Sequence, residues 1–231
     1  MENSPLSKNT LDQIFDQLKN KASLKQKVYG NIIEVFNHLK KEASGVADKL
    51  KKRIQEVDKS VIVGLYEINE FEFHLKFGGD LLVFILKTNV VSFPPEYPIM
   101  QNDYMKENES RKFFGSILIY NFMADSIKYN RQEDNGYLIG RMLVNIDNHF
   151  YIEGVRQLDF LFTDIEQNII SMPWLKLFIE KLILTALDTD LVGIKYGDLN
   201  KLTNYTKINQ SLQLGTGQKI GFQMTNNTEI S

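Results

Sequence analysis

An apolar stripe with an eleven-residue period constrains the fold of this chain more than any other feature. From residue 24 to residue 57 the apolar positions recur in steps of four, four and three residues, and this set of steps occurs three times. An average step of about 3.67 residues keeps these side chains on one side of a nearly straight α-helix. The stripe consists of Leu24, Val28, Ile32, Val35, Leu39, Ala43, Val46, Leu50, Ile54 and Val57. We therefore expect a helical rod about 50 Å long, at about 1.5 Å per residue.

Two helix-start signals lie at residues 10–13 and 23–26. In each, a hydroxyl residue is followed three positions later by a glutamine, which is the pattern of a capping box. We expect a first short helix that begins at Thr10, ends near Lys21 and packs one apolar face on a core. That face would hold Leu11, Ile14, Phe15 and Leu18. Gly45 lowers helix propensity, so a break in the second helix at this point is the alternative.

The segment 19–59 is strongly basic. It holds eleven lysine and arginine residues against five aspartate and glutamate residues, a net charge of +6. The whole chain carries −2, so the remainder carries −8. Such a charged stripe is either a docking surface for an acidic partner or for phosphates, or an ordinary solvated helix face. No arginine cluster and no interleaved aromatic residues point to base stacking, so we expect no nucleic-acid partner.

Beyond residue 60 the apolar period changes from that of a helix to that of a strand. Residues 71–77 alternate strictly between apolar and polar side chains, which indicates a strand with one buried face. Gly78-Gly79-Asp80 is a tight-turn signal, and Asp147-Asn148 is another. Further strand-like runs are residues 81–86, 115–123, 137–146, 149–153 and 156–162. Strands that follow one another without helices between them predict an antiparallel meander.

One further helix is predicted for residues 173–187, because Pro173 suits a first turn and apolar residues then recur at helical spacing. This helix is apolar on nearly all sides and requires burial, so we place it against the sheet. The proline-rich segment 93–98 and the polar residues that follow it predict either a short helix near residues 100–107 or a functional flap.

The predicted fold class is α+β, with an N-terminal helical arm, a curved and mostly antiparallel sheet of about six strands, and one buried helix in the C-terminal half. The expected units are the arm at 1–59, the α+β domain at 60–225 and a frayed tail at 226–231. The start of the chain lacks the basic and apolar regions of a secretory leader. The longest apolar run, 81–86, is too short to span a bilayer. We therefore expect a cytoplasmic protein without a membrane span.

The sequence lacks the motifs that bind most cofactors. There is no cysteine, which excludes disulfides, thiolate nucleophiles and cysteine-ligated metals. Residues 215–221 are rich in glycine but lack the spacing of either nucleotide-binding loop. His38, His74 and His149 are too far apart for a local metal-binding pair. No cofactor and no metal site are predicted.

The best local group for catalysis is Glu70, Glu72 and His74, which alternate with apolar residues around one strand. Carboxylates and an imidazole on one face are the groups used for acid–base work, as in a hydrolase or nuclease. A half-solvated strand produces the same pattern without any catalysis. The two interpretations remain open at this point.

A second candidate site consists of charged or aromatic residues within the later apolar segments. An unpaired charge is costly to bury, so such residues must reach water, pair with one another or line a cavity. A small-molecule cavity between the sheet and the helix 173–187 is one interpretation, and ion pairing or edge exposure is the other. The residues are Arg141, Glu153, Arg156, Asp159 and Trp174.

The function expected from these patterns is that of a non-enzymatic interaction or assembly module. The apolar stripe is longer than a small sheet can cover, so a protein partner or a second copy is expected to bind it. The residues predicted to bind the partner are Leu39, Val46, Leu50, Ile54, Lys41 and Lys52. A small-molecule sensor that uses the predicted cavity is the alternative, and a hydrolase or nuclease that uses residues 70–74 is the third hypothesis.

Overall fold

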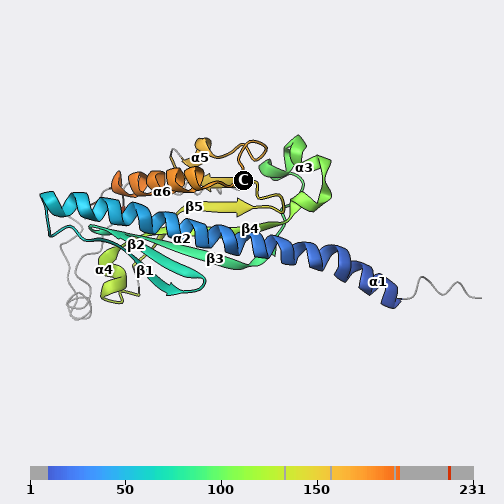
Figure 1. The fold of residues 1–231 in the computed structure, drawn as a ribbon, viewed down its shortest axis with the longest axis horizontal. Coiled ribbons are helices and arrows are strands. Elements are labelled where there is room, and N and C mark those ends of the chain that lie inside the picture. Colours follow the sequence, from blue (N-terminus) through green and yellow to red (C-terminus); the bar gives the residue numbers. More distant parts are fainter. Residues whose placement is uncertain (1–9, 133, 157, 190, 193–217, 220–231) are drawn as a thin grey trace, which may run out of the picture.

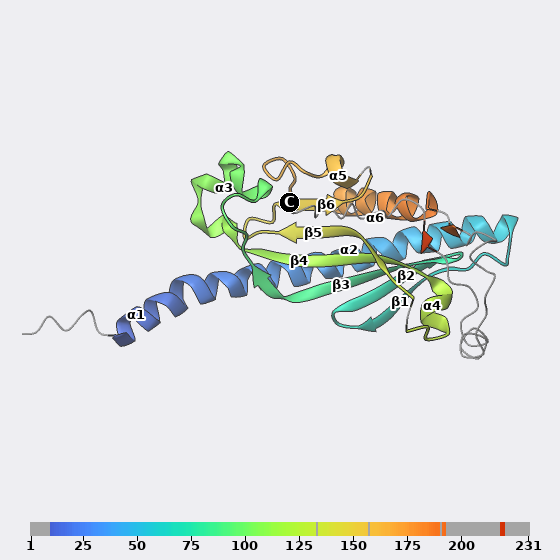
Figure 2. The same ribbon diagram turned by 180° about the vertical axis from the view of Figure 1, so that it is seen from behind.

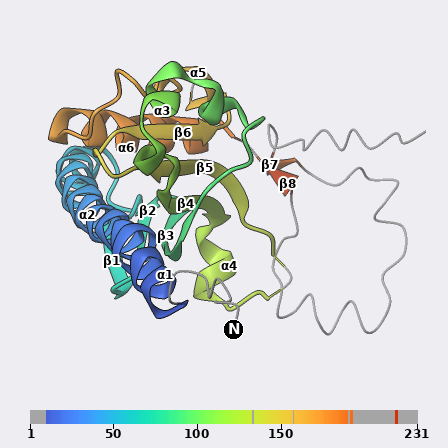
Figure 3. The same ribbon diagram turned by 90° about the vertical axis from the view of Figure 1, so that its right-hand side faces the viewer.

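The computed structural model describes residues 10–132, 134–156, 158–189, 191–192 and 218–219. Its centre is a six-stranded antiparallel sheet, with two long helices packed side by side on one face (Figure 1). Shorter helices lie on the opposite face, so the view along the first helix shows three layers (Figure 3). The predicted α+β class is confirmed.

The described part of the chain begins with one continuous helical rod. It comprises α1 (Thr10–Gln17), a five-residue π-helical segment η1 (Leu18–Ala22) and α2 (Ser23–Val57). The predicted end near Lys21 is wrong, because the rod continues through Ser23 with no side-chain cap at Ala22. At this point the hydrogen-bond ladder changes step, since the Ser23 N–H donates to the Leu18 carbonyl. The alternative break at Gly45 is also absent from this rod.

The middle of the apolar stripe packs onto the sheet. The stripe residues from Val28 to Val46 are all buried, and most of them belong to the main core together with the sheet. Leu50 and Ile54 are half-buried at the edge of that core, and Val57 is 84% exposed. The predicted rod is therefore present, and most of its stripe is covered by the chain's own sheet.

The sheet is a simple meander in which each strand pairs with the next along the chain. The predicted turn at Gly78-Gly79 joins the second and third strands, and the φ of +63° at Gly78 is one that glycine adopts without strain. The Asp147-Asn148 turn joins the last two strands, with Asn148 at a φ of 60°. The strands are β1 (Val63–Asn69), β2 (Glu72–Phe77), β3 (Asp80–Val91), β4 (Phe114–Met123), β5 (Tyr137–Val144) and β6 (Phe150–Gly154).

The predicted buried helix is α6 (Met172–Leu187). It lies beside α2 on the same face of the sheet (Figure 1). Its apolar face fills the space between α2 and the strands, and the fully buried residues are Leu175, Phe178, Ile179, Leu182 and Ala186. The helix therefore completes the core that the stripe of α2 begins.

Short helices cover the two ends of the other face of the sheet (Figure 2). The segment after β3 forms η2 (Pro98–Gln101), α3 (Asp103–Glu107) and η3 (Glu109–Lys112), which confirms a short helix there. It packs over β4 to β6 and forms a second apolar cluster. At the opposite end α4 (Ala124–Lys128) closes a third, smaller cluster.

The predicted strand at 156–162 is wrong, because the chain turns at Arg156 and forms the short helix α5 (Leu158–Leu161). Arg156 has a φ of 55°, which interrupts an extended strand. Leu158 and Phe162 are four residues apart and are both fully buried, as one face of a helical turn requires. The Ile152 N–H donates to the Phe162 carbonyl over 3.1 Å, so this segment covers part of the β6 edge.

Two short strands, β7 (Leu191–Val192) and β8 (Gln218–Lys219), form a separate antiparallel pair. The tail expected at 226–231 lies outside the described residues. The expected arm at 1–59 and the domain at 60–225 share one core over their described parts, since α2, the sheet and α6 contribute to the same apolar cluster.

Candidate functional site

A group of exposed apolar side chains lies on α1 and η1 of the long rod, which we call the projecting segment (Thr10–Ala22). It extends past the end of the six-stranded sheet, where no strand of the described residues lies beside it (Figure 1). The face predicted to pack on a core is exposed instead, which corrects that prediction. The exposed fractions are 67% for Leu11, 51% for Ile14, 62% for Phe15 and 59% for Leu18.

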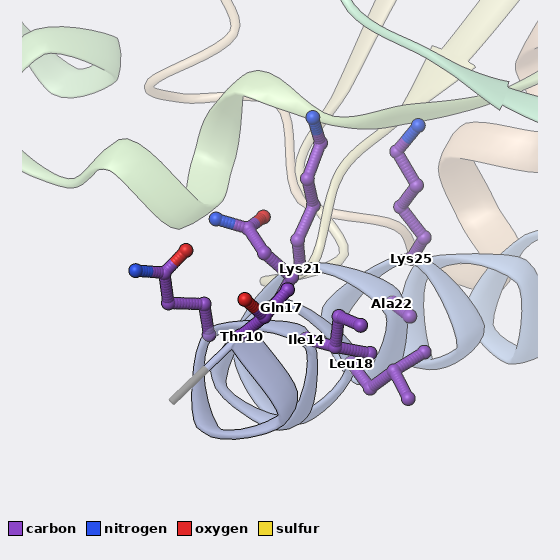
Figure 4. Close-up of a pocket in the computed structure, with 8 residues that line it drawn as sticks. Thr10, Ile14, Gln17, Leu18, Lys21, Ala22 and Lys25 are labelled. Atoms are coloured by element: carbon purple, nitrogen blue, oxygen red, sulfur yellow. The ribbon is translucent and has the colours of Figure 1, made fainter. Parts of the chain in front are cut away.

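A shallow hollow runs along this projecting segment and continues to its base. Ile14 and Leu18 line it together with Lys21 and Lys25, and the two lysines extend in the same direction (Figure 4). Thr10, Gln13, Gln17 and Ala22 complete the lining. The hollow thus combines apolar side chains with two cationic ones, which suits a protein surface better than a small apolar ligand.

A second hollow lies where the rod meets η3. It is lined by Lys21, Leu24 and Lys25 from the rod and by Glu109 and Lys112 from η3. The Lys25 ammonium lies 5.2 Å from the centre of the Phe113 ring, a cation–π distance. Lys112 is paired with Glu109. The rod is therefore held at this point by contacts with the segment that follows β3.

The six residues predicted to bind a partner do not form one accessible surface. Leu39 and Val46 are buried against the sheet, so the structure assigns them to the core. Leu50 and Ile54 are half-buried and pack against that same core. Lys41 and Lys52 are exposed on the outer side of α2. The prediction for Leu39 and Val46 is corrected because the sheet, and not a partner, covers them.

The catalytic hypothesis placed three residues together, and the structure brings two of them into contact. His74 is buried on β2, and its Nε2 lies 2.6 Å from Glu72 Oε1. Glu70 lies in the turn between β1 and β2 and not on the strand. A carboxylate next to an imidazole is an ordinary way to satisfy the polar atoms of a buried histidine.

Arg141 and Glu153 face each other across β5 and β6, and they also contact the segment that follows β3. Arg141 Nη2 donates to the Tyr97 hydroxyl over 2.9 Å, and that hydroxyl donates to Glu153. The Arg141 guanidinium lies 5.3 Å from the Phe93 ring centre. Burial raises the pKa of the Tyr97 phenol, and the contact with Glu153 acts in the same direction.

A second polar cluster fastens α3 to the turn between β5 and β6. The Tyr104 hydroxyl donates to Asp147 over 3.2 Å and accepts from Asn145 over 3.1 Å. Arg111 stacks 3.8 Å from the Tyr104 ring centre and donates to Asp147 over 2.9 Å. The His149 ring stacks on the same tyrosine at 4.5 Å. Burial raises the pKa of Tyr104.

The remaining residues of the predicted ligand cavity lie apart from Arg141 and Glu153. Arg156 donates to the Asp188 carbonyl over 3.1 Å, at the end of α6. Trp174 contacts the rings of Phe150 and Phe162 edge-on at the start of that helix. Asp159 lies in α5, and its side chain is outside the described part of the structure. The contacts described thus place Arg156 and Trp174 at opposite ends of α6, apart from the pairing of Arg141 with Glu153.

Sequence reasoning missed Tyr97 and Tyr104, which organise the two polar clusters. Their only local signal was aromatic residues inside a proline-rich polar segment, and their partners lie 41 to 56 residues away. The Arg141–Glu153 pair had a stronger signal. A hairpin centred on Asp147 places residues 141 and 153 opposite each other, as the observed register does.

Neither a metal-binding group nor a membrane-spanning helix is found among the described residues. In that part of the chain, no group of three or more histidine, aspartate or glutamate side chains is arranged to hold a metal ion. No helix within the same ranges has both the length and the apolarity needed to cross a bilayer.

Comparison with known proteins gives no relative from which a function can be transferred. No protein-family model, no curated protein and no solved structure matches this chain.

Proposed function

We propose that this protein is a non-enzymatic interaction module whose projecting segment docks on another protein. The observation that carries the proposal is the exposure of Ile14, Phe15 and Leu18 on one face of a helix that extends past the globular body. Large apolar side chains gathered on one exposed face mark interaction sites in soluble proteins. An amphipathic helix with apolar anchors at this spacing is a common form of such a site.

The electrostatics of the rod support the same function. The basic hollow at its base presents Lys21 and Lys25 next to the apolar face. Charges around an apolar centre steer association and fix the register of the bound partner. The remaining groups considered above are used within the fold, since Arg141, Glu153 and Tyr97 bind one another.

Native mass spectrometry of the tagged full chain, purified gently from its own cells, tests this proposal. We expect a complex of defined stoichiometry that is lost in the double variant Ile14→Glu, Leu18→Glu. The matched control is Leu184→Glu on α6, because Leu184 and Ile14 are both 51% exposed. A complex that survives in the double variant, or one that the control also loses, would contradict the proposal.

A further inference from the structure

We propose that the partner of the projecting segment is the same segment of a second copy, paired antiparallel. This inference rests on the proposed function and names its partner. Two identical helices related by a twofold axis form an isologous contact, in which residue i of one copy meets residue j of the other and residue j meets residue i. The surface must then be complementary to itself when it is reversed.

The order of charges along the projecting segment meets that condition. Asp12 lies in its first half and Asp16 at its centre, whereas Lys19 and Lys21 lie in its second half. Within the described residues, none of these four side chains has an intramolecular ion-pair partner. Antiparallel pairing places the acidic half of one copy beside the basic half of the other. Parallel pairing would place like charges together, which is unfavourable.

Asp12 and Lys19 are the pair that this arrangement brings together. They are seven residues apart, so they lie on nearly the same side of the helix, next to the edge of the apolar face formed by Phe15. A twofold axis that passes between Phe15 and Asp16 sets Asp12 of each copy opposite Lys19 of the other. The same axis lies near the middle of Ile14 and Leu18, so the apolar contacts and the ion pairs share one register.

The charges of the projecting segment also favour a second copy over a polyanion. Its two carboxylates, Asp12 and Asp16, balance the charges of Lys19 and Lys21 and repel a phosphate chain or an acidic peptide. A second copy instead meets Asp12 with an opposite charge, because Lys19 of that copy lies there in the register given above.

The contact is small, so the dimer is expected to be weak. The projecting segment has 13 residues, which corresponds to a helix about 20 Å long. This length offers less area than the roughly 800 Å² per partner of a standard interface. The dimer should therefore form and dissociate with concentration.

Sedimentation equilibrium of the purified full chain tests the inference. We expect a concentration-dependent dimer, and about tenfold weaker dimerisation in Asp12→Lys and in Lys19→Glu, because each substitution turns two attractive pairs into repulsive ones. An equimolar mixture of the two variants should dimerise as tightly as the wild type, since its heterodimer has only attractive pairs. The differences should shrink in high salt, which screens exposed charges.

The mixture also controls for folding, because a damaged variant cannot recover by mixing with another. The inference is overturned if the wild type stays monomeric at every concentration, if the single variants dimerise normally, or if mixing restores nothing. A monomeric chain that loses a complex with a different protein in Ile14→Glu, Leu18→Glu overturns this inference but leaves the proposed function standing. If neither association depends on the projecting segment, both fail.

Discussion

The projecting segment and the middle of α2 belong to one continuous helix, yet their apolar faces have opposite surroundings. Ile14, Phe15 and Leu18 are mostly exposed, whereas the stripe residues from Val28 to Val46 are buried. Both stretches show the spacing of an amphipathic helix. The comparison teaches that periodicity identifies an apolar face but does not identify what covers it.

The difference follows from length. The continuous helix has 48 residues, from Thr10 to Val57, and the longest strand of the sheet, β3, has 12 residues. At about 1.5 Å per helical residue the rod is about 70 Å long, and at about 3.3 Å per strand residue β3 is about 40 Å long. The sheet therefore covers only part of the rod, and the excess includes the projecting segment.

The sharpest test of this comparison truncates one phenylalanine in each stretch. Phe36 is buried with its ring 5.2 Å from that of Phe73, so Phe36→Ala should cost about 3–5 kcal/mol of unfolding free energy. Phe15→Ala should change stability by less than about 0.5 kcal/mol, because its side chain is exposed. Urea denaturation measures both values. Equal losses would show that the projecting segment is covered after all.

A second substitution tests how closely the covered stretch approaches the sheet. A Cβ added at Gly115 on β4 would lie 2.5 Å from the Cβ of Ile32, so α2 must move away to admit it. Gly115→Ala should destabilise the protein by about 1–3 kcal/mol, the usual cost of overpacking. Thermal unfolding measures the loss. A neutral result would indicate that α2 is packed more loosely on β4 than the structure describes.

A substitution on the solvent side of α2 should stabilise the protein. Gly45 is exposed in the interior of α2, and an added Cβ there meets nothing within 4 Å. Gly45→Ala should raise the unfolding free energy by about 1 kcal/mol, because alanine favours the helix. It should leave dimerisation of the projecting segment unchanged. Calorimetry and sedimentation of the same sample compare the two regions directly.

The smallest expected effect is a pH dependence that arises at the turn contacted by the covered stretch. Asn31 on α2 donates to the Ile146 carbonyl over 2.8 Å, at the turn that Tyr104 also holds. Because burial raises the pKa of Tyr104, the folded protein retains the phenol proton to a higher pH than the unfolded chain does. The stability that the protonated phenol contributes is complete below about pH 10 and is lost as the pH rises through the raised pKa.

Denaturation from about pH 8 to about pH 11 measures this loss. It should be smaller in Tyr104→Phe, which has no phenol proton, and Tyr129→Phe is the control because Tyr129 is exposed. An identical alkaline slope in wild type and Tyr104→Phe would refute this account of the turn.

Much of the fold was predictable because its signals are local. The Gly78-Gly79 turn and the helix at 172–187 follow from neighbouring residues alone. The helix α5 was not predictable from the sequence, because Leu158 and Phe162 are apolar residues at a spacing that fits a strand as well as a helical turn. Burial in the core selects the helical turn, and burial depends on distant residues.

The candidate site was less predictable for the same reason. The apolar face of the projecting segment was identified from its spacing, but its exposure depends on where the sheet ends. The residues assigned to a partner, Leu39 and Val46, have the same spacing and are covered. Tyr97 and Tyr104 bind residues far along the chain, and no local pattern marks such contacts.

The length of the five-residue π segment determines how the upstream part of the helix is oriented about its axis. Adding or removing one residue between Leu18 and Ala22 would turn everything upstream by about 100° around the helix axis. The globular body would be unaffected, because the helix is fixed only farther along. A change of one residue in the length of this segment therefore changes the direction in which the apolar face of the projecting segment points, without any change to the side chains of that face.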